Sequence, residues 1–394
     1  MLSRTIFDQA LRKIQVGGLT VHYWDGVTKT YGPEPYAEIT IHQPRALRAI
    51  LLDPPTGLGE CYMDGSIDLT DIIAISRLAA ENAAVVDNLN KIKLPRWRQP
   101  NRRRRQRRQI AHHYDLGNEF YSLWLDSSMT YSCGYYRNLG DTLERAQQQK
   151  TLHVLRKLQL TPGQSLLDVG CGWGQLLIAA AQQFGVTGYG ITLSAEQHAL
   201  AGRRVTEAGL AGKITIELCN YQDLAERGLT FDRVVSVGMY EHVGRGNHNT
   251  YFRALDQLLK PGGLNVLHTI TAPKLEPIGK WTDTYIFPGG YLPTVAQTTK
   301  LAERHHYELQ DYENLRYHYA LTLEEWLRRF EAHKSEVIAM YDERFYRMWK
   351  FYLATSAAGF RYSGLTLSQF VLTKGPHPEQ PLTREYLYGL SSDC

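Results

Sequence analysis

One stretch of ten residues restricts the possible folds of this chain more than any other, Ser165-Leu-Leu-Asp-Val-Gly-Cys-Gly-Trp-Gly174. Its apolar start, which ends in Asp168, predicts a buried strand, its alternating glycines predict a tight turn, and residues 175–184 predict a helix. Because glycine has no Cβ and tolerates positive φ, such a turn lets the backbone approach a ligand closely. The stretch therefore predicts a nucleotide-type site where a parallel strand ends and a helix begins.

Strands and helices are expected to alternate around this turn. We expect strands at 186–192, 213–218, 231–237, 264–268, 308–319 and 367–373, and helices at 142–158, 194–207, 249–259, 323–341 and 344–356. Such alternation is typical of a parallel sheet with helices on both faces, so the expected fold class is α/β. Residues 273–300 do not alternate, and their aromatic content suggests an insertion that covers a substrate.

A chain of 394 residues exceeds one ordinary core, so we expect more than one domain. Residues 1–90 predict a small α+β domain, associated with the lipid substrate or with dimer formation, without an evident catalytic cluster. Its predicted elements are strands at 18–26 and 37–42, a loop at 53–57, and helices at 44–52 and 72–89, the second capped by Asp71. Residues 91–110 predict a linker, and residues 111–394 predict the catalytic domain.

The predicted linker carries a strong local charge. Eight arginines and no acidic residue lie between Arg96 and Arg108, whereas the whole chain has a formal net charge of only +4. The run predicts docking to an anionic surface, either lipid headgroups or nucleic acid. A solvated connector between domains is the alternative interpretation.

The cysteine content and the N-terminus indicate the compartment. Five cysteines without a Cys-x-x-Cys pair are not typical of a disulfide framework or a structural zinc site, so we expect no metal and a reducing cytoplasm. Residues 1–8 lack the apolar segment of a signal peptide, and no window of about 18 apolar residues is present to span a membrane. Peripheral contact with a membrane is compatible with all of these features.

The glycine spacing distinguishes between nucleotide ligands. Dinucleotide enzymes prefer G-x-G-x-x-G, whereas this chain has G-x-G-x-G two residues after Asp168. That spacing favours S-adenosylmethionine, whose sulfonium cation can be stabilised by aromatic faces, and the chain has 25 tyrosines. Thr192, Ser194 and Gln197 stand where many methyltransferases place an acid for the ribose. Asp168 also has a purely structural interpretation, in which it orients the glycine loop.

Several motifs in one order resemble the cyclopropane-fatty-acyl-phospholipid synthases, in the mycolic acid cyclopropane synthase family. The likeness covers about 111–394 densely, and through Gly59-Glu-Cys-Tyr-Met-Asp-Gly65 it reaches the N-terminal domain of the bacterial enzymes. The motifs are His113-Tyr-Asp115, Tyr131-Ser-Cys133, Leu167-Asp-Val-Gly-Cys-Gly-Trp-Gly174, Thr192-Leu-Ser-Ala-Glu-Gln197, Val237-Gly-Met-Tyr-Glu-His-Val-Gly244, Leu267-His-Thr-Ile270, Phe287-Pro-Gly-Gly290 and His318-Tyr319.

The resemblance implies a Rossmann-like, seven-stranded class I methyltransferase that uses S-adenosylmethionine. In this family the methyl group goes to a cis double bond of an unsaturated phospholipid acyl chain, and loss of a proton to a bound bicarbonate ion closes a cyclopropane ring. The resemblance also implies peripheral contact with the inner face of the membrane and a homodimer. An alkene is a poor nucleophile and a carbocation reacts with water, so the site must hold the alkene in place and exclude water.

The resemblance assigns residues to two groups. Bicarbonate contacts map to the backbone of Cys133 and Ile270 and to the side chains of Glu241, His268 and Tyr319. Contacts with adenosylmethionine map to Tyr131, Ser132, Asp168, Gly170, Gly172, Gly174, Thr192, Gln197, Tyr221 and Gln222. Without the motifs, His268 has a structural interpretation, and Tyr319 and Cys133 could be core residues.

Two departures and three alternatives remain open. Tyr221-Gln222 is Trp-Glu in some relatives, and Ser356 stands at a position where the family has cysteine. Relatives make methyl-branched or hydroxylated chains by the same first step. A nucleic-acid methyltransferase is disfavoured because the loop after the strand at 231–237 is Gly238-Met-Tyr-Glu241, without the Pro-Pro-aromatic pattern. A lipid-binding module without catalysis is the third class.

Overall fold

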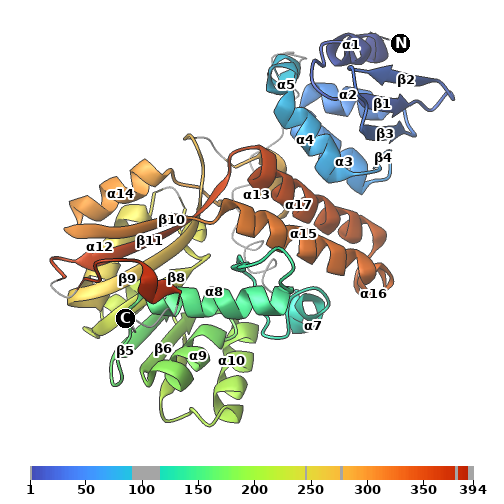
Figure 1. Ribbon diagram of the computed structural model, residues 1–394. Coiled ribbons are helices and arrows are strands. Elements are labelled where there is room, and N and C mark those ends of the chain that lie inside the picture. The colour runs from blue at the N-terminus through green and yellow to red at the C-terminus, as the bar shows by residue number, and fades with distance from the viewer. Residues whose placement is uncertain (1, 91–115, 245, 276–277, 378–379, 389–394) are drawn as a thin grey trace. The chain divides into compact units, whose positions relative to one another are not determined.

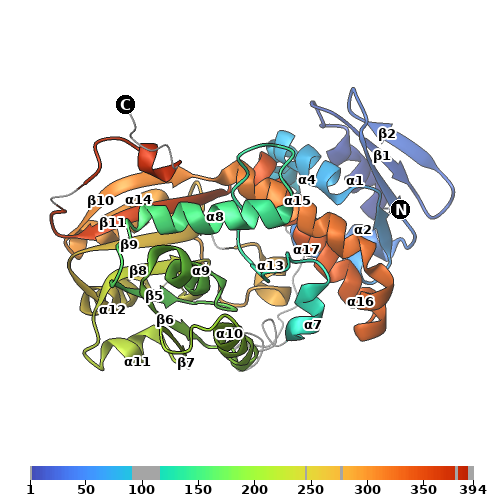
Figure 2. The same ribbon diagram turned by 60° about the horizontal axis from the view of Figure 1, so that its bottom comes forward.

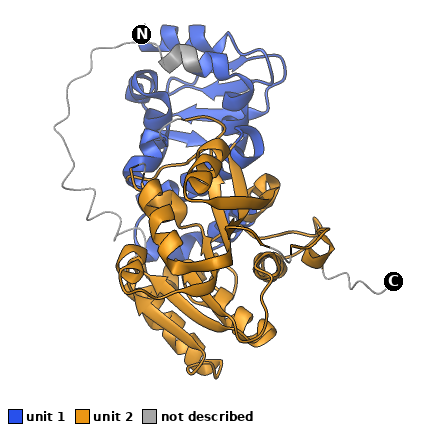
Figure 3. Ribbon diagram, turned by 90° about the vertical axis from the view of Figure 1, so that its left-hand side faces the viewer, with its two compact units in different colours: residues 1–110, 277–288, 323–364 blue, residues 111–276, 289–322, 365–394 orange. Residues whose placement is uncertain are grey.

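The computed structural model describes residues 2–90, 116–244, 246–275, 278–377 and 380–388. The chain divides into two compact units, coloured in Figure 3. Unit 1 contains residues 1–110, 277–288 and 323–364, and unit 2 contains residues 111–276, 289–322 and 365–394. Unit 1 therefore includes residues 277–288 and 323–364, which the sequence assigns to the catalytic domain. The functional division at 1–90, 91–110 and 111–394 stays a prediction, and the arginine run lies outside the described residues.

Unit 2 is built on a seven-stranded sheet in the order β10-β11-β9-β8-β5-β6-β7 (Figure 1). The strands are β5 (Ser165–Val169), β6 (Thr187–Thr192), β7 (Ile214–Leu218), β8 (Phe231–Val237), β9 (Leu259–Thr271), β10 (Tyr307–Asn314) and β11 (Thr366–Lys374). The first five are mutually parallel, and β11 is antiparallel to both β9 and β10. The predicted α/β fold class with a seven-stranded sheet is confirmed.

Helices cover both faces of this sheet (Figure 2). On one face lie α8 (Leu143–Lys157), α9 (Gln175–Phe184) and α10 (Ala195–Glu207), and on the other lie α11 (Tyr221–Ala225), α12 (His248–Leu258) and α14 (Val295–Arg304). Successive strand residues point to opposite faces, so Leu166 packs toward α8 and α9 while Leu167 packs toward α11 and α12. The short helix α7 (Gly117–Ser122) precedes α8, and the 3₁₀ turns η1 (Tyr240–His242) and η2 (Glu385–Leu387) complete the unit.

Unit 1 contains a four-stranded sheet in the order β2-β1-β3-β4. Its strands are β1 (Leu19–His22), β2 (Thr28–Tyr31), β3 (Ala37–Ile41) and β4 (Ile67–Leu69). Its helices are α1 (Leu2–Leu11), α2 (Arg45–Leu52), α3 (Pro54–Met63), α4 (Ile72–Glu81), α5 (Ala83–Asn90), α13 (Lys280–Tyr285), α16 (Lys334–Met340) and α17 (Glu343–Tyr362). Helix α15 (Arg316–Ala332) belongs to this unit from residue 323 onward.

Within unit 1, Arg347 on α17 binds groups of the N-terminal sequence. Its guanidinium donates hydrogen bonds to the carbonyl oxygen of Tyr62, to that of Ile67 at 2.7 Å, and to Asp68 Oδ1 at 2.7 Å. It also stacks on the Tyr62 ring at 4.1 Å from the centroid. A planar guanidinium with five donors can satisfy several acceptors at once, so one side chain connects α17 to α3 and β4.

Among the predicted elements that differ in the structure, three have a local cause. Residues 54–57 of the predicted loop at 53–57 form the start of α3, which Asp53 directly precedes, because proline is accepted at the first positions of a helix. The predicted helix at 72–89 is interrupted at Asn82, whose side chain bonds the carbonyl oxygens of Val16 and Leu78. The predicted strand at 308–319 ends at Asn314, and α15 begins at Arg316, whose N–H binds Asn314 Oδ1 at 2.9 Å.

Candidate active site

The predicted glycine turn connects β5 to α9 as expected. Gly170, Gly172 and Gly174 have φ angles of +90°, +53° and +84°, a region that disfavours other residues. A Cβ on Gly170 would lie 3.0 Å from Cβ of Met239, whereas a Cβ on Gly172 would meet no atom within 4 Å. The turn is held by the N–H groups of Gly170 and Cys171, which both donate to the Ile191 carbonyl at 3.0 Å. The space beside Gly172 suits the close approach of a ligand.

Asp168 lies directly before this turn and faces the α8 side of the sheet. Its side chain is buried, and its Oδ1 has no hydrogen-bond partner among the residues that the structure describes. Burial raises the pKa of Asp168 to about 7, and the charge of Lys150 opposes that rise. An unsatisfied buried carboxylate oxygen costs free energy, so this atom is suited to accept a hydrogen bond from a bound molecule.

Lys150 on α8 connects Asp168 to the loop that carries Ser132 and Cys133. Its ammonium is buried, donates to Ser132 Oγ at 3.1 Å, and lies close enough to Asp168 to interact with the charge of that carboxylate. Burial lowers the pKa of Lys150 to about 8, which Asp126 opposes most strongly. The sequence analysis missed Lys150. Its spacing of seven residues from Lys157, on one face of the predicted helix, was the available signal.

The loop before α8 lies against the start of α15. Cys133 is fully buried, and burial raises the pKa of its thiol. The next residue, Gly134, donates its N–H to Thr322 Oγ1 at 3.0 Å, and the Tyr136 N–H donates to His318 Nδ1 at 3.0 Å. Helix α15 is therefore held beside Cys133.

Tyr319 lies on a helix and not on the predicted strand. It occupies the first turns of α15, where its N–H binds the Leu315 carbonyl at 3.2 Å. Because Thr322 on the same helix contacts the Cys133 loop, the structure places Tyr319 in the element that packs on this loop.

Aromatic rings connect Tyr131 to the glycine turn. Tyr131 packs on Tyr121 and Trp124 with centroids 5.4 Å and 5.3 Å apart. Tyr121 in turn packs at 5.5 Å on Trp173, which stands within the glycine turn. Tyr131 and Trp173, the residue that follows Gly172 in the turn, therefore belong to one aromatic cluster, whose faces can stabilise a cation.

Two further predicted cofactor groups lie at the ends of β6 and β7. Thr192 donates its hydroxyl to Gln197 Oε1 at 2.8 Å, and the same hydroxyl accepts from the Ser194 N–H at 3.2 Å. This arrangement directs the Gln197 carbonyl toward Thr192 and leaves its amide N–H₂ group to serve as a donor. Tyr221, at the start of α11, packs edge-on to Tyr251 at 5.6 Å, and the Gln222 N–H is held by Asn220 Oδ1 at 2.9 Å.

Glu241 and Ile270 are brought together by the pairing of β8 with β9. Glu241 Oε1 accepts a hydrogen bond from the Ile270 N–H at 2.6 Å. The second oxygen, Oε2, is buried without a partner in the described part of the chain. Burial raises the pKa of Glu241 to about 7, partly opposed by the Ile270 N–H.

His268 lies two residues before Ile270 in β9 and is almost completely buried. Its Nδ1 lies 2.9 Å from Gln369 Nε2 on β11, and its Nε2 has no partner among the described residues. Burial lowers the pKa of His268 well below its usual value, and the charges of Lys150 and Lys157 lower it further. The imidazole is therefore neutral at physiological pH.

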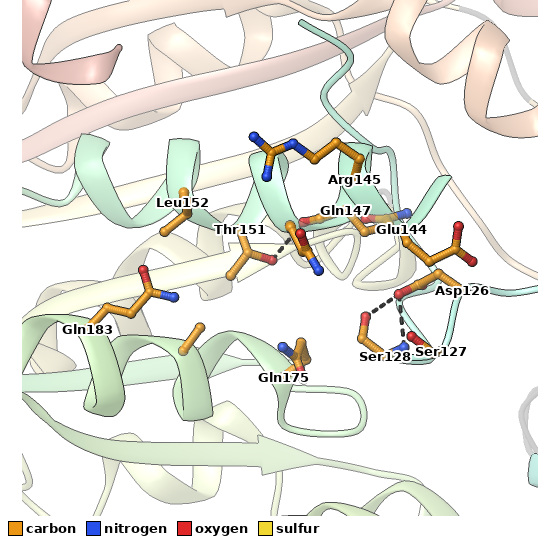
Figure 4. Close-up of a pocket in the computed structure, with 12 residues that line it drawn as sticks. Asp126, Ser127, Ser128, Glu144, Arg145, Gln147, Thr151, Leu152, Gln175 and Gln183 are labelled. Carbon is orange, nitrogen blue, oxygen red and sulfur yellow. Dashed lines mark hydrogen bonds between the residues drawn. The ribbon is translucent and has the colours of Figure 1, made fainter. Parts of the chain in front are cut away.

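A separate hollow lies between α8 and α9, with a volume of about 460 Å³ (Figure 4). Polar side chains line it, including Asp126, Glu144, Gln147, Gln175 and Gln183. None of the predicted site residues lines this hollow. Gln147 lines the hollow and donates its amide to the Ser132 carbonyl at 2.8 Å. This side chain therefore helps to hold the backbone of Ser132, a predicted site residue, in position.

Two protein-family models match separate parts of the chain. The model for mycolic acid cyclopropane synthetase matches residues 101–370, and the model for a domain of unknown function matches residues 6–85. The cyclopropane-fatty-acyl-phospholipid synthase of Escherichia coli K12 is 40% identical, over 86% of this chain and 88% of the relative. A probable fatty acid methyltransferase of Pseudomonas putida is 36% identical, over 94% of this chain and 96% of the relative.

Solved structures agree with these relatives. The cyclopropane synthase MmaA2 from Mycobacterium tuberculosis matches with a TM-score of 0.64 and 34% identity, over 68% of this chain and 98% of the other. The mycolic acid cyclopropane synthase CmaA1, solved with SAH and CTAB, matches with a TM-score of 0.64, 32% identity and the same coverages. The glycine turn, the sheet order and these matches together show that the chain belongs to the mycolic acid cyclopropane synthetase family and is an S-adenosylmethionine-dependent enzyme.

Proposed function

We propose that the protein transfers the methyl group of S-adenosylmethionine to a cis double bond of an unsaturated phospholipid acyl chain, with cyclopropane ring closure assisted by bicarbonate. One observation carries this proposal. Three buried polar atoms without partners among the described residues, Asp168 Oδ1, Glu241 Oε2 and His268 Nε2, belong to elements at the carboxyl ends of adjacent parallel strands. In open α/β sheets that edge is where ligands bind.

The residues fit adenosylmethionine. The open space at Gly172 admits the ligand, and the aromatic cluster around Tyr131 can face a sulfonium. The Thr192–Gln197 pair offers an amide donor to sugar hydroxyls, and Tyr221 offers a ring to the adenine. Asp168 and Ser132 supply an acceptor and a hydroxyl for the amino-acid end.

The residues also fit a small planar oxyanion. His268 Nε2 can donate, and Glu241 Oε2 can accept from a protonated oxygen, so the pair suits an ion with both kinds of oxygen, as bicarbonate has. Cys133 and Ile270 would contribute backbone contacts, and Tyr319 a hydroxyl. When bound, adenosylmethionine supplies an electrophilic methyl group and bicarbonate a base.

Burial of these groups supports chemistry without water. Cys133, Asp168, Glu241 and His268 are all buried, so the charges and dipoles around the reacting atoms act in a low dielectric. The Ile270 N–H and Gln369 hold Glu241 and His268 in position before any ligand binds. The same burial limits access of water, which would otherwise convert a carbocation into an alcohol.

The test is incubation with adenosylmethionine and vesicles of unsaturated phospholipid, followed by mass spectrometry and NMR of the acyl chains. We expect chains that gain one methylene group and carry the ring protons of a cyclopropane. Depletion of bicarbonate should slow turnover, and its return should restore the rate. Absence of any modified chain would overturn the proposal.

A second product class has its own support. The tuberculostearic acid methyltransferase of Mycobacterium tuberculosis is 36% identical, over 91% of this chain and 88% of the relative. The name of this relative states a methyltransferase and no ring closure, so we keep a methyl-branched chain as an alternative product of the same first step. A hydroxylated chain is the other alternative. The NMR spectrum distinguishes these products, because the alternatives lack the ring protons.

We further propose peripheral contact with the inner face of the membrane and a homodimer, with no role for nucleic acid. In the described ranges no helix is long and apolar enough to span a bilayer. The eight arginines between Arg96 and Arg108 would bind anionic headgroups. Flotation with anionic and with neutral vesicles tests the contact, and sedimentation tests the dimer. Equal binding to both vesicle types, or a monomer under assay conditions, would contradict these proposals.

A further inference from the structure

A chain of buried hydrogen bonds leads from α8 to His268. Lys157 Nζ on α8 donates to Gln369 Oε1 on β11 at 2.7 Å, and Gln369 Nε2 lies 2.9 Å from His268 Nδ1 on β9. All three side chains are at most 1% exposed. Three separate elements of unit 2 therefore meet in one polar layer between the sheet and α8.

The charge of Lys157 is held by an acid. Glu313 on β10 lies 2.5 Å from Lys157 Nζ and also accepts a hydrogen bond from His153 Nε2 at 2.6 Å. Burial raises the pKa of Glu313, but the hydrogen bond from His153 and the charge of Lys157 outweigh this and lower it to about 2. Burial lowers the pKa of Lys157, and the Glu313 carboxylate opposes this effect. The pair is therefore an ammonium and a carboxylate.

The positive charge of Lys157 determines the direction of both hydrogen bonds that connect Lys157, Gln369 and His268. An ammonium can only donate, so the carbonyl oxygen of Gln369 must face Lys157. The amide nitrogen of Gln369 then faces His268 and can only donate, so His268 Nδ1 must accept. A neutral imidazole carries one proton, and with Nδ1 as the acceptor that proton is on Nε2.

The protonated nitrogen is the one without a partner. His268 Nε2 is buried and has no hydrogen-bond acceptor in the part of the chain that the structure describes. A buried N–H donor in that position needs an acceptor to offset its lost hydration. The opposite tautomer would present a lone pair there, which repels an anion.

We propose that Lys157 and Gln369 are positioning residues that hold His268 in its Nε2–H tautomer, as a donor to a bound oxyanion. The inference rests on the proposed function, because it takes the bicarbonate site as the place where this N–H is used. It adds two residues, neither of which touches the reacting atoms. It also explains why a buried lysine and a buried glutamine meet a half-buried glutamate on this face of the sheet.

The first test reads the tautomer directly, without turnover. Long-range ¹H–¹⁵N spectra of protein labelled at histidine distinguish protonated from unprotonated ring nitrogens, and His268→Asn identifies the signal of His268. We expect the Nε2–H tautomer in the native protein. In Gln369→Glu the carboxylate should accept from Nδ1 and reverse the tautomer. An Nδ1–H tautomer in the native protein would overturn the proposal.

The second test compares two substitutions at Gln369. Gln369→Met keeps the volume but removes the donor, so both tautomers become accessible, whereas Gln369→Glu selects the wrong one. We expect the half-saturating bicarbonate concentration to rise roughly tenfold or more in Gln369→Glu and less in Gln369→Met, with adenosylmethionine affinity unchanged in both. If Gln369 only filled space, the half-saturating bicarbonate concentration would not be higher in Gln369→Glu than in Gln369→Met. An equal rise in the two variants would therefore overturn the proposal.

Two controls keep these outcomes distinct. Gln149→Met changes a different buried glutamine, which lies on α8 and bonds Asp141 at 2.8 Å, and should leave tautomer and bicarbonate dependence as in the native protein. The double variant Lys157→Met/Glu313→Gln releases the Gln369 amide without leaving an unpaired buried charge, and both tautomers should then appear. If native turnover does not depend on bicarbonate, the proposed base is wrong, while the spectra still decide the tautomer.

Discussion

The Glu241 carboxylate accepts a hydrogen bond from the Ile270 N–H at 2.6 Å, which connects η1 after β8 to the end of β9. One oxygen is thereby fixed by the backbone, and the other is buried without a partner among the described residues. The carboxylate is therefore oriented before any ligand arrives. Preorganised polar groups of this kind contribute strongly to transition-state stabilisation, because they need no reorganisation during the reaction.

Glu241→Gln should abolish most turnover and leave adenosylmethionine binding intact. The amide can still accept from the Ile270 N–H, but it presents a donor where Oε2 would accept from the proposed ion. We expect the rate of acyl-chain modification to fall roughly 100-fold or more. Calorimetric titration with adenosylmethionine checks binding, and Glu308→Gln, at an exposed site on β10, is the control. Retained turnover would contradict the assigned role.

Asp168→Asn should change how stability depends on pH. Burial raises the pKa of Asp168 to about 7, so between the usual carboxyl value near 4 and pH 7 the folded protein binds a proton that the unfolded chain releases. Protonation of Asp168 in the folded state therefore raises the free energy of unfolding. This contribution is complete below about pH 4 and is lost as the pH rises through about 7. Relative to native protein, Asp168→Asn should gain about 4 kcal/mol of unfolding free energy between pH 4 and pH 8.

Urea unfolding without ligand, at several pH values, measures this difference. The exposed Asp223→Asn on α11 serves as the control and should follow the native pH dependence. If the free energies of unfolding of Asp168→Asn and of the native protein changed with pH in parallel, Asp168 would titrate normally in the folded state.

Gly172→Ala should weaken adenosylmethionine binding much more than it weakens the fold. Gly172 and Gly209 both have positive φ, +53° and +70°, and both have open space where a Cβ would stand. Alanine at either site should therefore cost a similar 1–2 kcal/mol, approximately, of backbone strain. Thermal unfolding checks this cost. Titration should show an affinity loss only in Gly172→Ala, and equal binding by the two variants would place the ligand elsewhere.

The Cys133 thiol should be unreactive and dispensable. Burial raises its pKa, so no thiolate is available at pH 8, and the contact assigned to Cys133 involves its backbone. Iodoacetamide should modify Cys133 only in unfolded protein, as peptide mass spectrometry can show. Cys133→Ala should keep most of the turnover. Rapid alkylation of the folded protein with loss of activity would contradict this role.

Arg347→Met should loosen unit 1. The substitution leaves the Tyr62 and Ile67 carbonyls without the guanidinium that α17 provides, and such losses cost about 2–4 kcal/mol. Limited proteolysis should then cleave the first 90 residues faster. Arg328→Met removes the ion pair of the largely exposed Arg328 with Glu325 and should change the cleavage rate little. Equal cleavage of both variants would contradict the role of Arg347.

Local patterns predicted most of unit 2 because each depends on a few neighbouring residues. The strand at 231–237 was confirmed, and the helix predicted at 142–158 is α8, Leu143–Lys157. In the structure the side chains of Thr142 and Ser194 cap α8 and α10. The predicted end of the strand at 319 was wrong, because the Asn314 side chain accepts from the Arg316 N–H, where α15 begins, within a run of residues that also suits a strand. The loop at 53–57 was wrong because Pro54 and Pro55 begin α3 instead of preventing a helix.

By itself the sequence determined the fold class, the glycine turn and the order of the motifs, because these depend on side-chain periodicity and on residues close along the chain. Only the tertiary structure decided which groups meet. Lys157, Glu313 and Gln369 are far apart in sequence, and only the pairing of β9, β10 and β11 beneath α8 brings them to His268. The proton on His268 Nε2 follows from those contacts, because the direction of a hydrogen bond depends on the partner at each end.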